Sequence, residues 1–486
     1  MTKFIKTTLL AAMLLAQAAS ARTVLGIEGE EATSVGIYIK DLSTGQTIID
    51  HNSSLALTPA SVMKALTTAT VLSLSGTDKC FTTPVVLSGH ADGETWHGNL
   101  IIESSADPTL ESENFKSRLG FCDSIASRLK SMGVTRIEGS TLVEQSLKDA
   151  GPVVQWEIED VAWPYGAGLY GFNWRDNTVK ITPATGKVVP EAPGLEICVE
   201  KAKSNDLLRG IDSNRLTVYT RDPDDEKYTL STTVPDPAAV FKAQLREVLG
   251  REGIEIGDEE LAPDTLRTTV YTHRSATYGD IMKSLMVRSD NLFAEGMLRT
   301  IAPGASRKEA IKRERDLWSK RNIDMRRTII NDGSGLTRAN RLPARLIGDV
   351  LEWMARSQMA DTYTSFFPRA GKDGTMRGFL AKSSLKGRIA LKTGSVSSVQ
   401  CYAGYKLDAN DKPTHVVVIL VNGFFCPRKN VREACEKLLT ETFAGKPASN
   451  QSAVSSKPKK TAGASTAKKT SKKTRKTTKK TNKARR

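Results

Sequence analysis

The chain has 486 residues, of which 39% are hydrophobic and 26% charged, and its formal net charge at pH 7 is +16. This length is enough for several domains and for more than one hydrophobic core. The basic excess lies at the ends, since 15 Lys and Arg fall within residues 446–486 and two within 1–21, which leaves residues 22–445 with a charge of −1. The charge therefore does not indicate a nucleic-acid-binding body, and nucleic acid is not expected as a partner.

The first 21 residues have the pattern of a secretory signal peptide. Lys3 and Lys6 precede an apolar stretch, Leu9–Leu15, and a small-residue cleavage site follows at Ala19-Ser20-Ala21. The apolar stretch is too short to cross a bilayer, and no later apolar run is long enough either. We therefore predict export to the periplasm, with or without peripheral attachment to the membrane or the cell wall.

The mature chain begins with a predicted β-hairpin and a helix. Residues 33–53 alternate apolar and polar side chains around a Ser-Thr-Gly turn, as a hairpin requires. Thr58 and Pro59 then precede a helical stretch that extends to about residue 76. Residues 80–264 differ in character, because short β-like segments alternate there with Gly, Pro, Asp and Asn, interrupted by one helix-to-strand unit at 240–256.

The last part of the body returns to long helical patterns and ends with strands. Helices are predicted within 278–302, 308–323 and 344–359, strands within 388–407 and 414–425, and a final helix at 431–443. Strands from both ends can share one antiparallel sheet with helices on its faces. The predicted fold is α+β: a split domain, residues 22–79 and 265–445, around a mostly β insert, residues 80–264.

Residues 446–486 form a tail of Lys, Thr, Ala and Ser that lacks apolar anchors. Such a segment buries too little apolar surface to offset its ordering entropy, so we predict disorder. Its charge favours binding to an anionic envelope surface. The alternative is a solvated tail that only keeps the protein soluble.

Cysteine and aromatic residues leave alternatives open. Six cysteines in an exported chain permit up to three disulfides, and Cys426 and Cys435 are closest in sequence.

No metal or cofactor is expected, because no CxxC pair, HExxH, P-loop or GxGxxG motif occurs. An aromatic group could bind sugar or, as we favour, pack the insert against the main domain; it comprises Trp156, Trp163, Tyr165, Tyr170 and Trp174.

A Ser-x-x-Lys sequence opens the helix that follows the hairpin. Positions three apart on a helix lie roughly 5–6 Å apart, so Lys64 can reach Ser61. A serine needs a base to become a nucleophile, and a lysine can be that base when burial and helix-end potential favour its neutral amine. Alone this motif is weak, because Ser and Lys occur at this spacing by chance.

Two further motifs follow in an order that strengthens the interpretation. Ser289-Asp290-Asn291 stands between helical segments, and Lys392-Thr393-Gly394 stands on a strand. Asn291 offers an amide to a peptide bond, while Lys392 and Thr393 suit a substrate carboxylate. Ser289 can relay a proton between Lys64 and a leaving amine. The order SxxK, SDN, KTG is the set of the active-site serine, penicillin-recognising enzymes.

The chain resembles the class C low-molecular-mass penicillin-binding proteins, the D-alanyl-D-alanine carboxypeptidase/endopeptidase family of the penicillin-binding protein 4 kind (peptidase family S13). The resemblance spans about residues 35–440 and includes the segments ADPTL, YGAGLYGFNWRDN, NDGSGLTRAN and AGKDGTMRG. The chain departs from the family in having Ser104-Ser105-Ala106 where a glycine run usually precedes Asp-Pro.

The resemblance implies a serine β-lactamase/transpeptidase-like domain and a set of roles. Ser61 would be the acylated nucleophile, Lys64 its base, Ser289 and Asn291 the second motif, and Lys392, Thr393 and the backbone of Ser395 the carboxylate and oxyanion side. The expected activity is a periplasmic D-Ala-D-Ala carboxypeptidase, with or without endopeptidase activity, that acts on peptidoglycan stem peptides and is inhibited covalently by β-lactams. A non-catalytic wall-binding protein with a polybasic tether is the alternative, and a β-lactamase is a lesser one.

Overall fold

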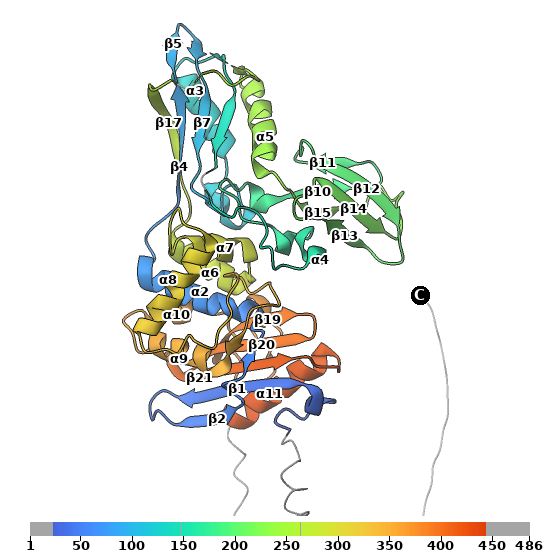
Figure 1. Cartoon of the computed structure of the whole chain (residues 1–486), viewed down its shortest axis with the longest axis vertical. Helices are drawn as coiled ribbons and strands as arrows, with labels where there is room; N and C mark the ends of the chain where they lie inside the picture. The colour runs from blue at the N-terminus through green and yellow to red at the C-terminus, as the bar shows by residue number, and fades with distance from the viewer. Residues whose placement is uncertain (1–22, 146, 263, 444–486) are drawn as a thin grey trace, which may run out of the picture. The chain divides into compact units, whose positions relative to one another are not determined.

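A five-stranded antiparallel sheet joins the two ends of the chain in this computed structural model, which describes residues 23–145, 147–262 and 264–443 (Figure 1). The strand order is β19-β20-β21-β1-β2. The predicted hairpin at 33–53 is confirmed, since its two strands pair antiparallel. The strands are β1 (Ser34–Asp41), β2 (Thr47–His51), β19 (Ile389–Val396), β20 (Val399–Leu407) and β21 (Pro413–Asn422).

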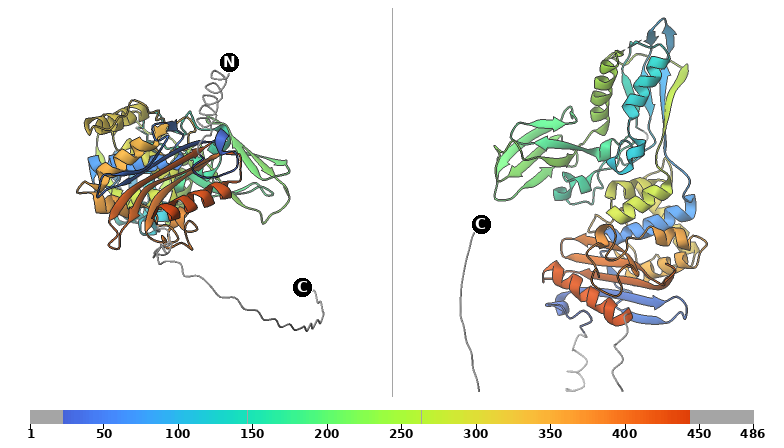
Figure 2. Two further views of the ribbon diagram at one scale, coloured as in Figure 1. Left: turned by 90° about the horizontal axis from the view of Figure 1, so that it is seen from below. Right: turned by 180° about the vertical axis from the view of Figure 1, so that it is seen from behind.

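The two faces of this sheet are both buried, and successive residues of each strand alternate between them. In β21, Val416, Val418 and Leu420 join the core under the helices, whereas Val417, Ile419 and Val421 join a second core. Helix α11 (Arg428–Phe443) covers the second core and lies across the sheet in the rear view of Figure 2. This explains why residues 416–421 form a continuous apolar run.

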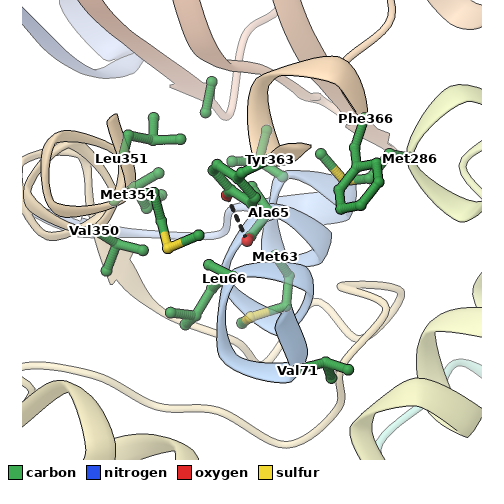
Figure 3. Packing of buried hydrophobic residues seen from close by; sticks show 14 of the residues in the cluster. Met63, Ala65, Leu66, Val71, Met286, Val350, Leu351, Met354, Tyr363 and Phe366 are labelled. Atoms are coloured by element: carbon green, nitrogen blue, oxygen red, sulfur yellow. Dashed lines mark hydrogen bonds between the residues drawn. The ribbon is translucent and has the colours of Figure 1, made fainter. Parts of the chain in front are cut away.

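The first core lies between the sheet and a group of helices that surround α2 (Met63–Ser75). Figure 3 shows Met63, Leu66 and Val71 of α2 among side chains from the other helices, where the hydroxyl of Tyr363 donates to the carbonyl of Ala65 at 2.7 Å. Helix α2 is therefore enclosed rather than amphipathic. The other helices are α6 (Tyr278–Arg288), α7 (Asn291–Arg299), α8 (Arg307–Lys320), α9 (Ala344–Ala355) and α10 (Ala360–Ser365).

The region between residues 80 and 264 is mostly β, as predicted, and has its own hydrophobic core. One four-stranded sheet has the order β17-β4-β7-β9, and α3 (Phe121–Ser131) and α5 (Pro237–Arg251) contribute to the same core. The four strands are β4 (Thr82–Ser88), β7 (Leu100–Glu103), β9 (Thr141–Glu144) and β17 (Arg267–Arg274). Strand β17 lies after residue 264 in sequence but pairs with β4 along its whole length (Figure 1).

Three smaller sheets complete this region. Their orders are β16-β8-β6-β5, β11-β10-β15 and β12-β14-β13. The strands are β5 (His90–Asp92), β6 (Thr95–His97), β8 (Arg136–Ile137), β10 (Thr178–Thr182), β11 (Lys187–Val189), β12 (Glu196–Lys201), β13 (Asp206–Arg209), β14 (Arg215–Thr220), β15 (Leu230–Thr233) and β16 (Glu255–Ile256). A short helix, α4 (Ile158–Val161), leads from this region back toward α7. The predicted domain limits, residues 22–79 with 265–445 and residues 80–264, stay predictions.

Several expectations concern covalent links and the chain ends. All six cysteines are free, including Cys426 and Cys435, so the structure contains none of the disulfides that the sequence permits. Within the described ranges, no helix is both long and apolar enough to cross a membrane. The predicted signal peptide, residues 1–21, and the predicted basic tail, residues 446–486, lie outside the described residues.

Candidate active site

Lys64 is fully buried, and its amine is held by three acceptors, two of which come from distant parts of the chain. Its Nζ atom donates to the hydroxyl of Ser61 at 3.1 Å, to the side-chain oxygen of Asn291 at 2.6 Å and to the backbone carbonyl of Ser334 at 2.7 Å. Three acceptors match the three protons of an ammonium group. The amine therefore has a fixed position beside the serine hydroxyl.

Burial also changes the acidity of this lysine. Loss of hydration lowers the pKa of Lys64 to about 8, although the nearby carboxylates of Asp332, Asp290 and Glu295 act in the opposite direction. An amine with this pKa is neutral in about one molecule in ten at pH 7, far more often than an ordinary lysine. It meets the requirement for a base that takes a proton from the serine.

Ser61 stands on a tight turn, not on the regular helix that the sequence predicts after Pro59. It lies in the 3-10 turn Ala60–Val62, and α2 begins only at Met63. Ala60 has a left-handed backbone with φ of 47°. Two glycines pack closely against this turn. A Cβ atom on Gly335 would lie 1.9 Å from the carbonyl oxygen of Ala60, and a Cβ atom on Gly394 would lie 2.6 Å from the carbonyl oxygen of Pro59. Only glycine allows these two segments to approach so closely.

The second predicted motif, Ser289-Asp290-Asn291, forms the junction between α6 and α7. Ser289 ends α6 in a left-handed conformation with φ of 64°, and the Asp290 side chain caps α7 by accepting from the Phe293 backbone N–H at 3.0 Å. Asn291 can therefore point back to Lys64. The Ser289 hydroxyl accepts a hydrogen bond at 2.9 Å from Lys392, so its partner here is the lysine of the third motif and not Lys64.

The third motif lies on β19, an edge strand of the sheet. Lys392 is fully buried, and burial lowers its pKa well below the usual value, with the charge of Lys64 acting in the same direction. The Thr393 hydroxyl donates to the hydroxyl of Thr375 at 2.8 Å, and the Ser395 hydroxyl donates to the side chain of Gln400 at 2.9 Å.

Two cavities meet at Ser61, Ser289 and Ser395. The first has a volume of about 290 Å³ and is also lined by Thr393, Thr375, Phe379, Tyr402 and Arg432. The second has a volume of about 400 Å³ and adds charged and aromatic side chains from the insert, from the loop before α9 and from the start of α11: Asp160, Tyr165, Arg338 and Arg428. A substrate that enters both cavities would cross the serine hydroxyl.

The structure thus brings all seven predicted site residues into one region: Ser61, Lys64, Ser289, Asn291, Lys392, Thr393 and Ser395. Sequence reasoning missed Thr375, Arg432, Asp160 and Arg338, and it missed the carbonyls of Ser334 and Tyr165. Most of these residues lie in or near the segments AGKDGTMRG, NDGSGLTRAN and YGAGLYGFNWRDN, for which the sequence suggested a resemblance but no role. At the departure from the family pattern, Ala106 takes a left-handed backbone with φ of 57°, as a glycine would do without strain.

Comparison with solved structures identifies the fold as that of a penicillin-binding protein with an inserted region, which confirms the predicted fold class. Penicillin binding protein 4 (dacB) from Haemophilus influenzae matches with a TM-score of 0.71 and 23% sequence identity over 85% of this chain and 96% of that one. The chain belongs to the D-Ala-D-Ala carboxypeptidase 3 (S13) family, whose model matches residues 23–442. It is a serine-type D-Ala-D-Ala carboxypeptidase, and the resemblance drawn from the three motifs is confirmed.

Two curated relatives agree with this assignment. The D-alanyl-D-alanine carboxypeptidase of Actinomadura sp. (strain R39) is 26% identical over 412 residues, covering 77% of this chain and 75% of the relative. The D-alanyl-D-alanine carboxypeptidase DacB of Haemophilus influenzae is 26% identical over 428 residues, covering 81% and 86%.

Proposed function

We propose that this carboxypeptidase cleaves the terminal D-Ala-D-Ala bond of peptidoglycan stem peptides through an acyl-enzyme on Ser61. The observation that supports this proposal best is the amine of Lys64, which is buried, has a pKa lowered to about 8 and lies 3.1 Å from the Ser61 hydroxyl. Removing a proton from a serine is the main obstacle to its attack on an amide.

The proposed reaction has two steps. The Ser61 oxygen attacks the carbonyl of the penultimate residue while Lys64 accepts the hydroxyl proton. The C–N bond then breaks, the terminal D-alanine leaves as an amine that receives a proton through Ser289, and an ester joins the peptide to Ser61. Water hydrolyses this ester and restores the hydroxyl. The backbone N–H groups of Ser61 and Ser395 are the proposed donors to the oxyanion.

Lys392 and Thr393 are the proposed partners of the substrate's terminal carboxylate. Thr393 lines the first cavity, and Lys392 donates to Ser289, which also lines it; Arg432 adds a further positive charge there. A carboxylate bound there favours the ammonium form of Lys392, and that charge in turn favours the neutral amine of Lys64. Substrate binding would therefore help to activate the base.

The acyl side of the substrate is proposed to occupy the second cavity. An extended peptide can lie along the free edge of β19, with Asp160 and the guanidinium of Arg338 available to charged groups of its side chain. The Haemophilus influenzae penicillin binding protein 4 has also been solved in complex with a β-lactam, at 24% identity and a TM-score of 0.69. We propose the same class of inhibitor here, bound covalently to Ser61.

Intact-mass analysis after incubation with a β-lactam tests the nucleophile. The wild-type chain and Ser73→Ala, a control on α2 outside the cavities, should gain the mass of one inhibitor, and Ser61→Ala should gain none. Labelling of Ser61→Ala would reject the proposed nucleophile. Rapid loss of the label from wild type would favour the β-lactamase alternative, and an unlabelled wild type that still binds cell walls would favour the non-catalytic alternative.

Release of D-alanine from a soluble peptide ending in D-Ala-D-Ala tests the reaction itself. Cleavage of a cross-linked peptide dimer in the same assay would add the endopeptidase activity.

For location, we propose that residues 1–21 direct the chain to the periplasm and that residues 446–486 hold it near anionic envelope surfaces. A mature periplasmic protein that begins at Arg22 is the expected result of N-terminal mass analysis.

A further inference from the structure

One short segment of the insert supports both of the acceptors that hold Lys64 beside Ser61. We call residues 153–165 the bridging segment. At its end, the carbonyl of Tyr165 accepts a hydrogen bond at 2.7 Å from the amide nitrogen of Asn291, whose oxygen receives the Lys64 amine. The second acceptor, the carbonyl of Ser334, is supported from the start of the segment, in the manner described next.

Ser334 belongs to a buried turn that is organised by the carboxylate of Asp332. One carboxylate oxygen accepts from the Gly335 N–H at 2.9 Å and the Asn340 side chain at 2.6 Å. The other accepts from the Thr337 N–H and from the indole N–H of Trp156, both at 2.9 Å. Four donors therefore fix a carboxylate that has no access to water.

Further contacts attach the bridging segment to this turn. The Thr337 hydroxyl donates to the carbonyl of Gln155 at 2.8 Å, and Val153, Trp156 and Leu336 form a small hydrophobic cluster. On the opposite side of the turn, the carboxylate of Glu295 accepts from the N–H groups of Gly333 and Ser334, each at 2.9 Å. The turn is thus held between α7 and the insert.

We infer that Trp156 is a positioning residue: through Asp332 it fixes the Ser334 carbonyl, and so holds the general base against the nucleophile. The inference rests on the proposed function of Lys64. It gives the insert a part in catalysis itself, because the bridging segment also carries Asp160 and Tyr165 of the second cavity. Trp156 makes no hydrogen bond to Ser61 or Lys64 among the described residues, so it acts only through the turn.

The charges that face Lys64 predict how the loss of the Trp156 indole would change the protonation of Lys64. Asp332, Asp290 and Glu295 favour the ammonium form of Lys64, whereas burial of the amine disfavours it. Without the indole N–H, the Asp332 carboxylate loses one of the donors that offset its charge. The ammonium form of Lys64 then gains stability, and the neutral base is rarer near neutral pH.

The test is the rate constant of acylation by a fluorescent penicillin, measured against pH for Trp156→Phe. Phenylalanine keeps an aromatic ring but has no N–H. We expect a loss of about fivefold or more near pH 7 together with a shift of the acidic limb to higher pH. The control is Trp96→Phe. It also removes a buried indole hydrogen bond, which Trp96 donates to the Ser88 carbonyl at 2.6 Å, but in the described part of the chain neither residue contacts the turn at Ser334.

Two results would overturn the inference. One is slower acylation of Trp156→Phe without a shift in the acidic limb of its pH profile, because a general loss of structure gives that result. The other is an acylation rate equal to that of the wild type at every pH. If Trp156→Phe does not fold, Thr337→Val decides instead. It removes the bond to Gln155 and the bond that the hydroxyl accepts from the Ala339 N–H within the turn, and it should slow acylation in the same way, with Thr328→Val as its buried control. Failure of the wild type to be acylated would reject the proposed function, whereas a wild type and variants that behave alike would reject only the role of Trp156.

Discussion

The amine of Lys64 lies 3.1 Å from the hydroxyl of Ser61 and spends its other two hydrogen bonds on Asn291 and Ser334, which are 227 and 270 residues away in sequence. Two residues that are neighbours in sequence are therefore held in place by residues far away in the chain. Replacing Lys64 with Ala or Arg should lower the rate of acylation by about 10² or more, because the general base is lost. A fluorescent penicillin measures that rate directly.

Arginine is the more informative of the two replacements. It keeps the positive charge and much of the volume but cannot lose its proton in a protein. If Lys64→Arg were acylated as fast as the wild type, Lys64 would serve only as a charge, and the base would have to be sought elsewhere.

The pH dependence of acylation follows from the same lysine. Because the pKa of Lys64 is lowered to about 8, the neutral amine is the minor form below that pH and the major form above it. The rate should therefore rise by about tenfold per pH unit below the pKa and level off above it. A rate that is highest in acid and falls toward pH 8 would contradict a neutral Lys64 as the base.

Gly394 sets the distance between β19 and the turn that carries Ser61. In Gly394→Ala, the new Cβ would lie 2.6 Å from the Pro59 carbonyl oxygen and 3.0 Å from the Val62 backbone nitrogen, so the strand or the turn must move. We expect acylation to fall by about tenfold or more, since small displacements at a reacting centre are costly. Gly250→Ala on α5 is the control, because its Cβ would have open space and the helix favours alanine.

Tyr363→Phe tests how far the packing around α2 depends on one buried hydrogen bond. The phenol donates to the Ala65 carbonyl at 2.7 Å inside the core (Figure 3). Its loss should reduce the free energy of unfolding by about 1–3 kcal/mol, measured by chemical denaturation. Tyr278→Phe, for which the described residues show no hydroxyl hydrogen bond, should change stability much less; equal losses in both variants would place the cost in packing rather than in the bond.

Deleting residues 446–486 should leave the turnover of a small soluble peptide nearly unchanged. It should weaken binding to anionic vesicles at low salt, because 15 basic residues are removed. A variant with the tail lysines replaced by glutamine separates charge from length. Binding of the full-length chain that does not change with salt would contradict an electrostatic tether.

The sequence could predict the chemistry of the site because its motifs are local. Ser61 and Lys64 are joined by helical spacing, and the SDN and KTG sequences carry their side chains on recognisable elements. The hairpin of β1 and β2 could also be predicted, because its sequence alternates apolar and polar residues around a turn.

Other features depend on tertiary contacts that leave little trace in the sequence. The carbonyls of Ser334 and Tyr165 are backbone atoms that any residue could supply, so composition does not identify them. The left-handed Ala60 and its 3-10 turn pack directly against Gly335 and Gly394. Both glycines are far away in the chain, so the local sequence does not reveal this packing. Pairing of β17 with β4 likewise joins strands almost 200 residues apart in sequence. Next to it, the Phe81 N–H donates to the hydroxyl of Ser275, which lies 194 residues further along the chain.

The scattered origin of the lysine's partners also has a consequence during biosynthesis. A chain that has formed only its first hairpin and helix would carry a hydrated, protonated Lys64 and an ordinary serine. Lys64 is buried beside Ser61 only after Asn291 and Ser334 have reached it. These contacts close loops of more than 200 residues, and contacts between residues so far apart in sequence form slowly. Partly folded forms of this hydrolase are therefore expected to lack an activated serine, and activity should appear only with the completed fold.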